Sequence, residues 1–190
     1  MQVSAVIPAA GNSGRMGRDK AVLHISHGQT FAGHLVNCFG VYGCRPVVLV
    51  VNDRSDTKKT NQENIITVVN HNVDLGRSHS IWLGLHYVPE GFSCFIHNVD
   101  NPYLEPEMLD WLLGLVQPDS FVVPVNTGRG GHPVLLGSRV AAHLRDQDQP
   151  ADFRKTLHEF KRLELSWPDD RILLNINTPE DYKRFILGKQ

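Results

Sequence analysis

The amino-acid sequence predicts an α/β fold: a three-layer αβα sandwich in which a mainly parallel, Rossmann-like sheet is covered by helices on both faces. Short β-type runs alternate with helix-length segments along the chain, and this alternation is typical of βαβ units. The run Pro46–Val51 (PVVLVV) is apolar at every position, as expected for a strand that is covered on both faces. The length of 190 residues fits a single domain over residues 1–190.

The expected elements follow in chain order. Strands are expected at the short apolar runs Val3–Ile7, Pro46–Val51, Ile65–Val69, Ser93–Asn98, Phe121–Val125, Val134–Leu136 and Ile172–Ile176. Helices are expected at Thr30–Phe39, Ser78–Tyr87, Glu105–Val116, Ser138–Leu144 and Phe153–Phe160. A last helix begins after Thr178, since Thr178 is a good N-cap and Pro179 suits the first helical position. The polar stretch Arg54–Gln62 is expected to be a solvent-facing helix or loop.

The amino-acid composition argues against several classes of protein and binding partner. The chain has 19 basic and 20 acidic residues and a formal net charge of −1, which argues against a nucleic-acid coat or a membrane-surface protein. The three cysteines are odd in number and form no CxxC motif, so a disulfide framework or zinc knuckle is not expected. No run has the length of a membrane span or a signal peptide. We expect a soluble, cytoplasmic protein.

A glycine-rich stretch, "AAGNSGRMGRDK" (residues 9–20), directly follows the first predicted strand. Ligands of open parallel sheets bind at the carboxyl ends of strands. Glycines let the backbone approach an anion closely and direct N–H groups at it. Arg15 and Lys20 add positive charge where phosphates would lie. The stretch therefore predicts a loop that wraps a nucleoside triphosphate.

Three other interpretations of this loop can be compared with the sequence: a Walker A loop, a dinucleotide-binding loop and a plain strand–helix connection. A Walker A loop needs GxxxxGK[ST], and no Ser or Thr follows Lys20, so we exclude it. A dinucleotide fingerprint needs GxGxxG and an acid about 20 residues later. The spacing of Gly11, Gly14 and Gly17 is GxxGxxG, and no acid lies near position 40, so this alternative is weak. A plain strand–helix connection stays open on these residues alone.

The loop resembles the signature of the nucleotidyltransferases that attach a nucleotide to the molybdenum cofactor, roughly [AG]-A/G-G-x-S-x-RMG-x-x-K. Further segments resemble that family in the same order along nearly the whole chain: "NHNVDLGRSHSIWLGL" (70–85), "NVDNPYL" (98–104), "GRGGHPVLL" (128–136) and "NINTPEDY" (175–182). Several motifs in the right order make chance an inadequate explanation.

The resemblance implies a Mg²⁺-dependent enzyme that transfers a nucleotide and releases pyrophosphate. Arg15, Lys20 and Asp100 are the expected catalytic residues: the two cations would hold the triphosphate, and Asp100 would be the first Mg²⁺ ligand, at the carboxyl end of a strand. Asn177, or alternatively Asn175, would be the second ligand. One branch of the family has Asp at both of these places, whereas this chain offers only amide oxygens there.

Nucleotide recognition is expected from backbone and short polar side chains. The expected binding residues are Pro8, Ala9, Ala10, Gly11, Ser13, Asn70, Ser78, Ser80 and His132. Ser78 and Ser80 have a structural alternative as helix caps. His132 would lie near the acceptor or the nucleotide, or would only orient a loop. Arg77 could reach a phosphate or solvent equally well.

The expected substrates are CTP or GTP and a phosphorylated acceptor such as molybdopterin. Some motifs are closer to the cytidylyl branch of the family and others to the guanylyl branch, so the base stays open. The first alternative is a non-catalytic nucleotide-binding or regulatory module, which the uncharged Asn175 and Asn177 favour. A dinucleotide-dependent oxidoreductase comes third.

Overall fold

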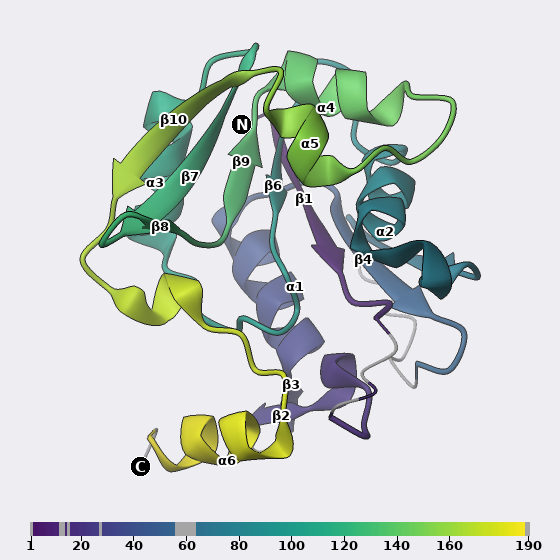
Figure 1. Ribbon diagram of the computed structural model, residues 1–190, viewed down its shortest axis with the longest axis vertical. Helices are drawn as coiled ribbons and strands as arrows, with labels where there is room; N and C mark the ends of the chain where they lie inside the picture. The colour runs from purple at the N-terminus through teal and green to yellow at the C-terminus, as the bar shows by residue number, and fades with distance from the viewer. Residues whose placement is uncertain (1, 12–13, 15, 27, 56–63, 189–190) are drawn as a thin grey trace.

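The computed structural model describes residues 2–11, 14, 16–26, 28–55 and 64–188. Its main sheet has eight strands in the order β10-β7-β9-β6-β1-β4-β5, and β8 pairs with β7 (Figure 1). The strands are β1 (Val3–Pro8), β4 (Val47–Asn52), β5 (Ile65–Asn70), β6 (Ser93–Ile96), β7 (Ser120–Asn126), β8 (Arg129–Gly130), β9 (Val134–Leu136) and β10 (Lys161–Ser166). Neighbouring strands are parallel except where β8 and β9 are involved.

Helices cover both faces of this sheet, which confirms the three-layer prediction (Figure 1). The helices are α1 (Phe31–Tyr42), α2 (Gly76–Leu85), α3 (Pro106–Leu115), α4 (Ser138–Arg145), α5 (Phe153–Leu157) and α6 (Pro179–Leu187). Alternate strand residues face opposite layers, since successive side chains of a strand point in opposite directions. In β1, Ala5 and Ile7 belong to the core cluster with α1 and α3, whereas Val6 belongs to the cluster with α2, α4 and α5.

The chain reverses its direction of travel across the sheet at β1. It passes from β1 through α1 to β4 and β5, and then returns through α2 to β6 on the other side of β1. Val6 is accordingly in register with Val48 of β4 and with Ile96 of β6. A ligand crevice is expected at the carboxyl ends of the strands at such a switch point. In this chain that place lies between β1 and β6.

In the last third of the chain one expected strand was wrong and one strand was not predicted. The run Ile172–Ile176 is not a strand, because it consists of a 3₁₀ helix, η3 (Asp170–Leu173), and an irregular segment. Ile172 and Ile176 are buried there, so burial rather than sheet pairing explains the apolar run. The strand at the edge of the sheet is instead β10, which pairs in parallel with β7.

The start of α6 has the expected cap, and it fixes the residues just before the helix. Thr178 Oγ1 accepts a hydrogen bond from the Asp181 N–H at 3.1 Å, and Asp181 Oδ2 accepts from the N–H groups of Thr178 and Asn177 at 3.0 and 3.1 Å. This is a capping box. Helix α6 lies beside the hairpin of β2 (His24–Ser26) and β3 (Gln29–Thr30), where the Tyr182 hydroxyl donates to the His24 carbonyl (Figure 1).

The structure leaves two further expectations from the sequence untested. Residues 56–62 of the polar stretch Arg54–Gln62 lie outside the described residues. Within the described part of the chain, no helix combines the length and apolar character needed to span a bilayer. The cytoplasmic location stays a prediction.

Candidate active site

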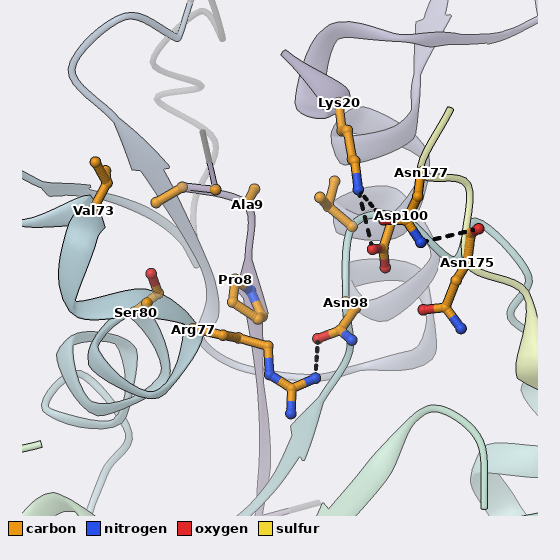
Figure 2. Close-up of a pocket in the computed structure, with 14 residues that line it drawn as sticks. Pro8, Ala9, Lys20, Val73, Arg77, Ser80, Asn98, Asp100, Asn175 and Asn177 are labelled. Atoms are coloured by element: carbon orange, nitrogen blue, oxygen red, sulfur yellow. Dashed lines mark hydrogen bonds and ion pairs between the residues drawn. The ribbon is translucent and has the colours of Figure 1, made fainter. Parts of the chain in front are cut away.

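A pocket of about 320 Å³ opens at the carboxyl ends of β1 and β6 (Figure 2). Four segments far apart in the sequence form it: the loop after β1, the start of α2, the loop after β6 and the segment before α6. The described residues that line it are Pro8, Ala9, Ala10, Gly11, Lys20, Val73, Gly76, Arg77, Ser80, Asn98, Val99, Asp100, Asn175 and Asn177. The pocket therefore lies at the switch point of the sheet.

Lys20, Asp100 and Asn177 meet on one side of this pocket (Figure 2). Lys20 Nζ donates to Asn177 Oδ1 at 2.6 Å and lies 3.4 Å from Asp100 Oδ2. Both charged side chains are mostly buried, with 16% and 19% of their surface exposed. Lys20 begins a short 3₁₀ helix, η1 (Lys20–Val22), whose N-cap Asp19 accepts from the Ala21 N–H. These three side chains were expected in one site from the sequence, and the structure brings them together.

A buried asparagine that the sequence motifs did not single out holds the Asp100 loop. Asn101 is fully buried, and its Nδ2 donates to the carbonyls of Arg171 and Ile172 at 3.1 and 3.0 Å. Its Oδ1 accepts from the Tyr103 N–H at 2.9 Å. The Asp100 carbonyl accepts from the Ile176 N–H at 2.9 Å. The loop that carries Asp100 is thus tied to the segment that leads to Asn177.

The start of α2 forms the opposite wall. Gly76 has a φ of +77°, which glycine adopts without strain, and this turn joins α2 to the 3₁₀ helix η2 (Val73–Leu75). Ser80 lines the pocket, and its Oγ accepts from Asn70 Nδ2 at 2.9 Å. The Ser80 hydroxyl can therefore still donate one hydrogen bond. Asn70 itself is fully buried, so its position supports a role in holding Ser80.

Two other predicted binding residues lie away from this pocket. The Ser78 side chain contacts α5 instead, where its Oγ accepts from the Phe153 N–H at 3.1 Å. Ser78 and Ser80 are inside α2 rather than at its N-cap, so the capping alternative was wrong. His132 lines a neighbouring pocket, and its Nε2 is hydrogen-bonded to Asn98 Nδ2 at 2.9 Å. Ser13 and Arg15 lie outside the described residues, and their roles stay predictions.

Two histidines, the fully buried His97 and the half-buried His132, lie behind the loop after β6. His97 Nε2 donates to the Asn101 carbonyl at 2.7 Å, and the rings of His97 and His132 are 5.9 Å apart. Burial lowers the pKa of His97 to about 4. Burial, aided by the neighbouring His97 and Arg77, lowers the pKa of His132 to about 3. Both imidazoles are therefore neutral at pH 7.

The donor set around Asp100 fits a divalent cation that is completed by substrate oxygens. Asp100 Oδ1 is buried and has no hydrogen-bond partner among the described residues, so one carboxylate oxygen is available. Asn177 Oδ1 is held in the same cluster by Lys20. The described residues contain no group of three or more His, Cys, Asp or Glu side chains suited to a metal. Mg²⁺ commonly binds through one or two protein carboxylates plus substrate phosphates and water.

The family to which the chain belongs is one of nucleotidyltransferases. The chain belongs to the MobA-like NTP transferase domain family, which it matches over residues 5–163. It is 30% identical over 204 residues to a probable molybdenum cofactor guanylyltransferase of Natranaerobius thermophilus, covering 98% of this chain and 97% of that protein. A dinucleotide-dependent oxidoreductase is therefore not retained as an alternative.

Solved structures agree on the fold. Rv0371c from Mycobacterium tuberculosis H37Rv has a TM-score of 0.79 at 19% identity, with 97% of each chain covered. The 2-C-methyl-D-erythritol 4-phosphate cytidylyltransferase of Thermus thermophilus has a TM-score of 0.74 at 16% identity, with 99% of this chain and 98% of that chain covered. The sheet and its helices are thus of the nucleotide-diphospho-sugar transferase type.

Proposed function

We propose that the protein transfers a guanylyl group from GTP to a phosphorylated acceptor of the molybdopterin type, with Mg²⁺ and release of pyrophosphate. The name of the relative that is 30% identical over almost its whole length supports the guanylyl donor and this acceptor class. The observation that carries the proposal is the meeting of Lys20, Asp100 and Asn177 at the switch point, in a pocket that the loop after β1 also lines.

The reaction joins two anions, so charge neutralisation and positioning supply most of the catalysis. An oxygen of the acceptor phosphate forms a bond to the α-phosphorus of GTP. The bond from that phosphorus to the bridging oxygen breaks, and pyrophosphate leaves with the electron pair. Lys20 would offset the negative charge on the transferring phosphate, and the location of its ammonium group in the pocket beside Asp100 supports this role.

Asp100 and Asn177 would hold Mg²⁺ through the free Asp100 Oδ1 and the Asn177 amide oxygen. When bound, the ion neutralises phosphate charge and orients the triphosphate. A solved structure of Rv0371c, which has a TM-score of 0.75 to this chain, is described as a complex with manganese. Only one of the two protein ligands is charged, so the affinity for Mg²⁺ should depend strongly on the triphosphate.

The base and ribose would lie between the loop after β1 and the start of α2. Ala9 and Ala10 bury their methyl groups in the core, so the loop offers the pocket mainly backbone groups. Backbone N–H and C=O groups can read a base edge without charge. The Ser80 hydroxyl, held by Asn70, supplies a donor on the facing wall. Lys20 lies across the pocket from Ser80, beside the Asp100 loop (Figure 2).

Thermal unfolding tests the binding half of the proposal. GTP, CTP, ATP and UTP are each added with and without Mg²⁺ to the full chain and to the variants Lys20→Ala and Asp100→Asn. At about 100 times its dissociation constant a ligand stabilises the folded state by about 2.7 kcal/mol, which is roughly 5 to 10 °C for a chain of this size. We expect this shift for GTP with Mg²⁺ and its loss in both variants.

The matched control is Lys183→Ala, because Lys183 is exposed on α6. It should keep the full shift. Stabilisation by CTP in place of GTP would correct the base and leave the site intact. The absence of any shift with all four nucleotides would contradict the proposal.

A further inference from the structure

Strand β10 is an edge of the main sheet. It is the last strand in the sheet order and pairs in parallel with β7 (Figure 1). At its end the Trp167 N–H donates to the Val125 carbonyl of β7 at 2.9 Å. Backbone groups of successive strand residues point to opposite edges of the strand. The odd-numbered residues of β10 therefore direct their N–H and C=O groups at β7, whereas those of Arg162 and Glu164 point away from the sheet.

This edge is able to accept a further strand. Within the described part of the chain, the outward N–H and C=O groups of Arg162 and Glu164 have no hydrogen-bond partner. β10 has six residues, contains no proline, and pairs with β7 without a bulge. A row of unpaired backbone groups of this length is a template for pairing with another chain.

The charges of β10 make a second copy of β10 a fitting partner for this edge. In an antiparallel pair, residues whose backbone groups point outward lie opposite one another. A register centred on Arg162 or on Glu164 sets like charges opposite each other, and a register centred on Leu165 sets Arg162 opposite Pro168, which has no N–H. The register centred on Leu163 instead sets Arg162 of each copy opposite Glu164 of the other. Opposite charges in such cross-strand pairs are stabilising, and like charges are destabilising.

An acidic cavity beside the edge is complementary to the lysine of a second copy. It has a volume of about 520 Å³, and its described lining contains no cation. That lining includes Glu105, Glu107, Trp111, Leu165, Trp167 and Asp169. Arg171 pairs with Glu105 and Asp169, whereas Glu107 and Lys161 have no ion-pair partner among the residues that the structure describes. In the register centred on Leu163, Lys161 of the second copy lies directly opposite Leu165, at this cavity.

Helix α3 adds exposed apolar surface on the same face of the sheet. Trp111 is 58% exposed, although it lines the cavity beside Leu165. α3 packs on β7 and β10, and Leu163 and Leu165 pack into the core on that face. A two-fold axis through Leu163, perpendicular to the sheet, leaves the α3 helices of both copies on one face. The exposed Trp111 of each copy then borders the contact, and tryptophan is enriched in protein–protein interfaces.

We propose that the protein forms a two-fold homodimer in which the β10 strands of two copies pair antiparallel about Leu163 and join the two sheets into one. Arg162 and Glu164 also pair with each other within a strand at 2.9 Å, so the two copies form a network of four charges. Lys161 of each copy enters the acidic cavity of the other. The nucleotide pocket is lined by other segments, so each copy keeps its own site, and the inference does not depend on the proposed reaction.

Charge reversal tests the interface, with sedimentation velocity of the full chain over a dilution series as the measurement. We expect the wild type to pass from one chain to two as its concentration rises. Arg162→Glu and Glu164→Arg each set like charges opposite one another and should weaken dimerisation at least about tenfold. The double variant Arg162→Glu/Glu164→Arg restores opposite charges and should dimerise as the wild type does. Arg139→Glu, at an exposed position on α4, is the charge-matched control and should also dimerise normally.

Disulfide cross-linking tests the register. Residues directly opposite each other in an antiparallel pair have Cβ atoms about 4.5 to 5.5 Å apart, so Leu163→Cys should form a covalent dimer under mild oxidation. Leu165→Cys is the matched control, because its partner across the axis is Lys161, and it should not form one. The wild type, oxidised in the same way, controls for the three native cysteines.

A wild type that remains a single chain at every concentration would overturn the proposal. So would a dimer that persists unchanged in both single charge variants, since it would use another surface. Equal cross-linking at the two cysteine positions would overturn the register. Circular dichroism and thermal unfolding of each variant check that it is folded, and restored dimerisation in the double variant excludes unfolding as the cause of the loss.

Discussion

Two histidines, the buried His97 and the half-buried His132, make folding stability sensitive to mild acid. His97 and His132 have pKa values of about 4 and about 3 in the folded protein, compared with about 6.5 in an unfolded chain. Between these limits the unfolded chain binds a proton at each imidazole and the folded chain does not. The free energy of unfolding must therefore fall as the pH falls below about 6.5.

The local geometry explains why the folded protein resists protonation. Protonation of His132 at Nε2 would break its hydrogen bond from Asn98. His97 already donates from Nε2, so a second proton would occupy Nδ1, which is buried without a partner among the described residues. The groups facing the two rings, namely Arg77, Arg154 and His34, are basic and add to the resistance.

The expected change in the free energy of unfolding follows from how far the pH lies below the unfolded-state pKa of about 6.5. Each pKa unit corresponds to about 1.4 kcal/mol, so at pH 5 each histidine lowers the free energy of unfolding by about 2 kcal/mol and the pair by about 4 kcal/mol. This is a large share of the roughly 5 to 15 kcal/mol that is typical of folded proteins. Urea unfolding at pH 7 and at pH 5 measures the change in the wild type and in the double variant His97→Asn/His132→Asn.

The double variant should lose about 4 kcal/mol less than the wild type between these two pH values. His24→Asn, at an exposed position on β2, is the control and should behave as the wild type. A direct check that does not depend on the variants folding is NMR titration of the wild-type imidazoles. Equal pH dependence in both chains, or titration of these two rings near pH 6.5 in the folded protein, would refute the reasoning.

Three other substitutions, and one control substitution, test the packing that positions the site. Asn101→Ala removes three side-chain hydrogen bonds and should lower the free energy of unfolding by about 3 kcal/mol; unchanged urea stability would contradict its role in holding the Asp100 loop. Gly84→Ala places a Cβ inside the contact distance of Val6 Cγ1, so overpacking should outweigh the gain in helix propensity and cost about 1 kcal/mol net. Gly114→Ala, with nothing within 4 Å, should instead stabilise by about 1 kcal/mol, and the same sign for both glycines in thermal unfolding would refute this. Thr178→Ala removes the cap of α6 and should cost about 1 kcal/mol, together with weaker Mg²⁺-dependent binding of GTP by calorimetry; unchanged binding would show that the cap does not fix Asn177.

The fold was predictable because its central strands carry a strong local signal. The runs at β1, β4 and β5 are apolar and β-branched, and the structure places them where expected. The edge strand β10 was missed because its residues are exposed or half-buried, although Leu163 and Leu165 alternate with polar residues as in a strand. The run Ile172–Ile176 was wrongly predicted to be a strand. Its apolar side chains are buried as those of a strand would be, but they lie on an irregular backbone.

The site was predictable in its residue types and only partly in its geometry. Lys20 and Asp100 are 80 positions apart, and Lys20 and Asn177 are 157 apart, so only the motifs indicated that they would meet. Sequence left Arg77 open between phosphate and solvent, and its bond to Asn98 settles its direction. Asn101 gave no chemical signal, because a buried asparagine that ties two loops is recognisable only once both loops are placed.

Pyrophosphate release tests the central claim most directly. The full chain is incubated with GTP, Mg²⁺ and molybdopterin, and pyrophosphate is measured over time beside Asp100→Asn. We predict release that requires all three components and is lost in the variant. If the wild type binds GTP with Mg²⁺ but releases no pyrophosphate with this acceptor or with other phosphate monoesters, the protein is a nucleotide-binding module and the proposed transfer is wrong.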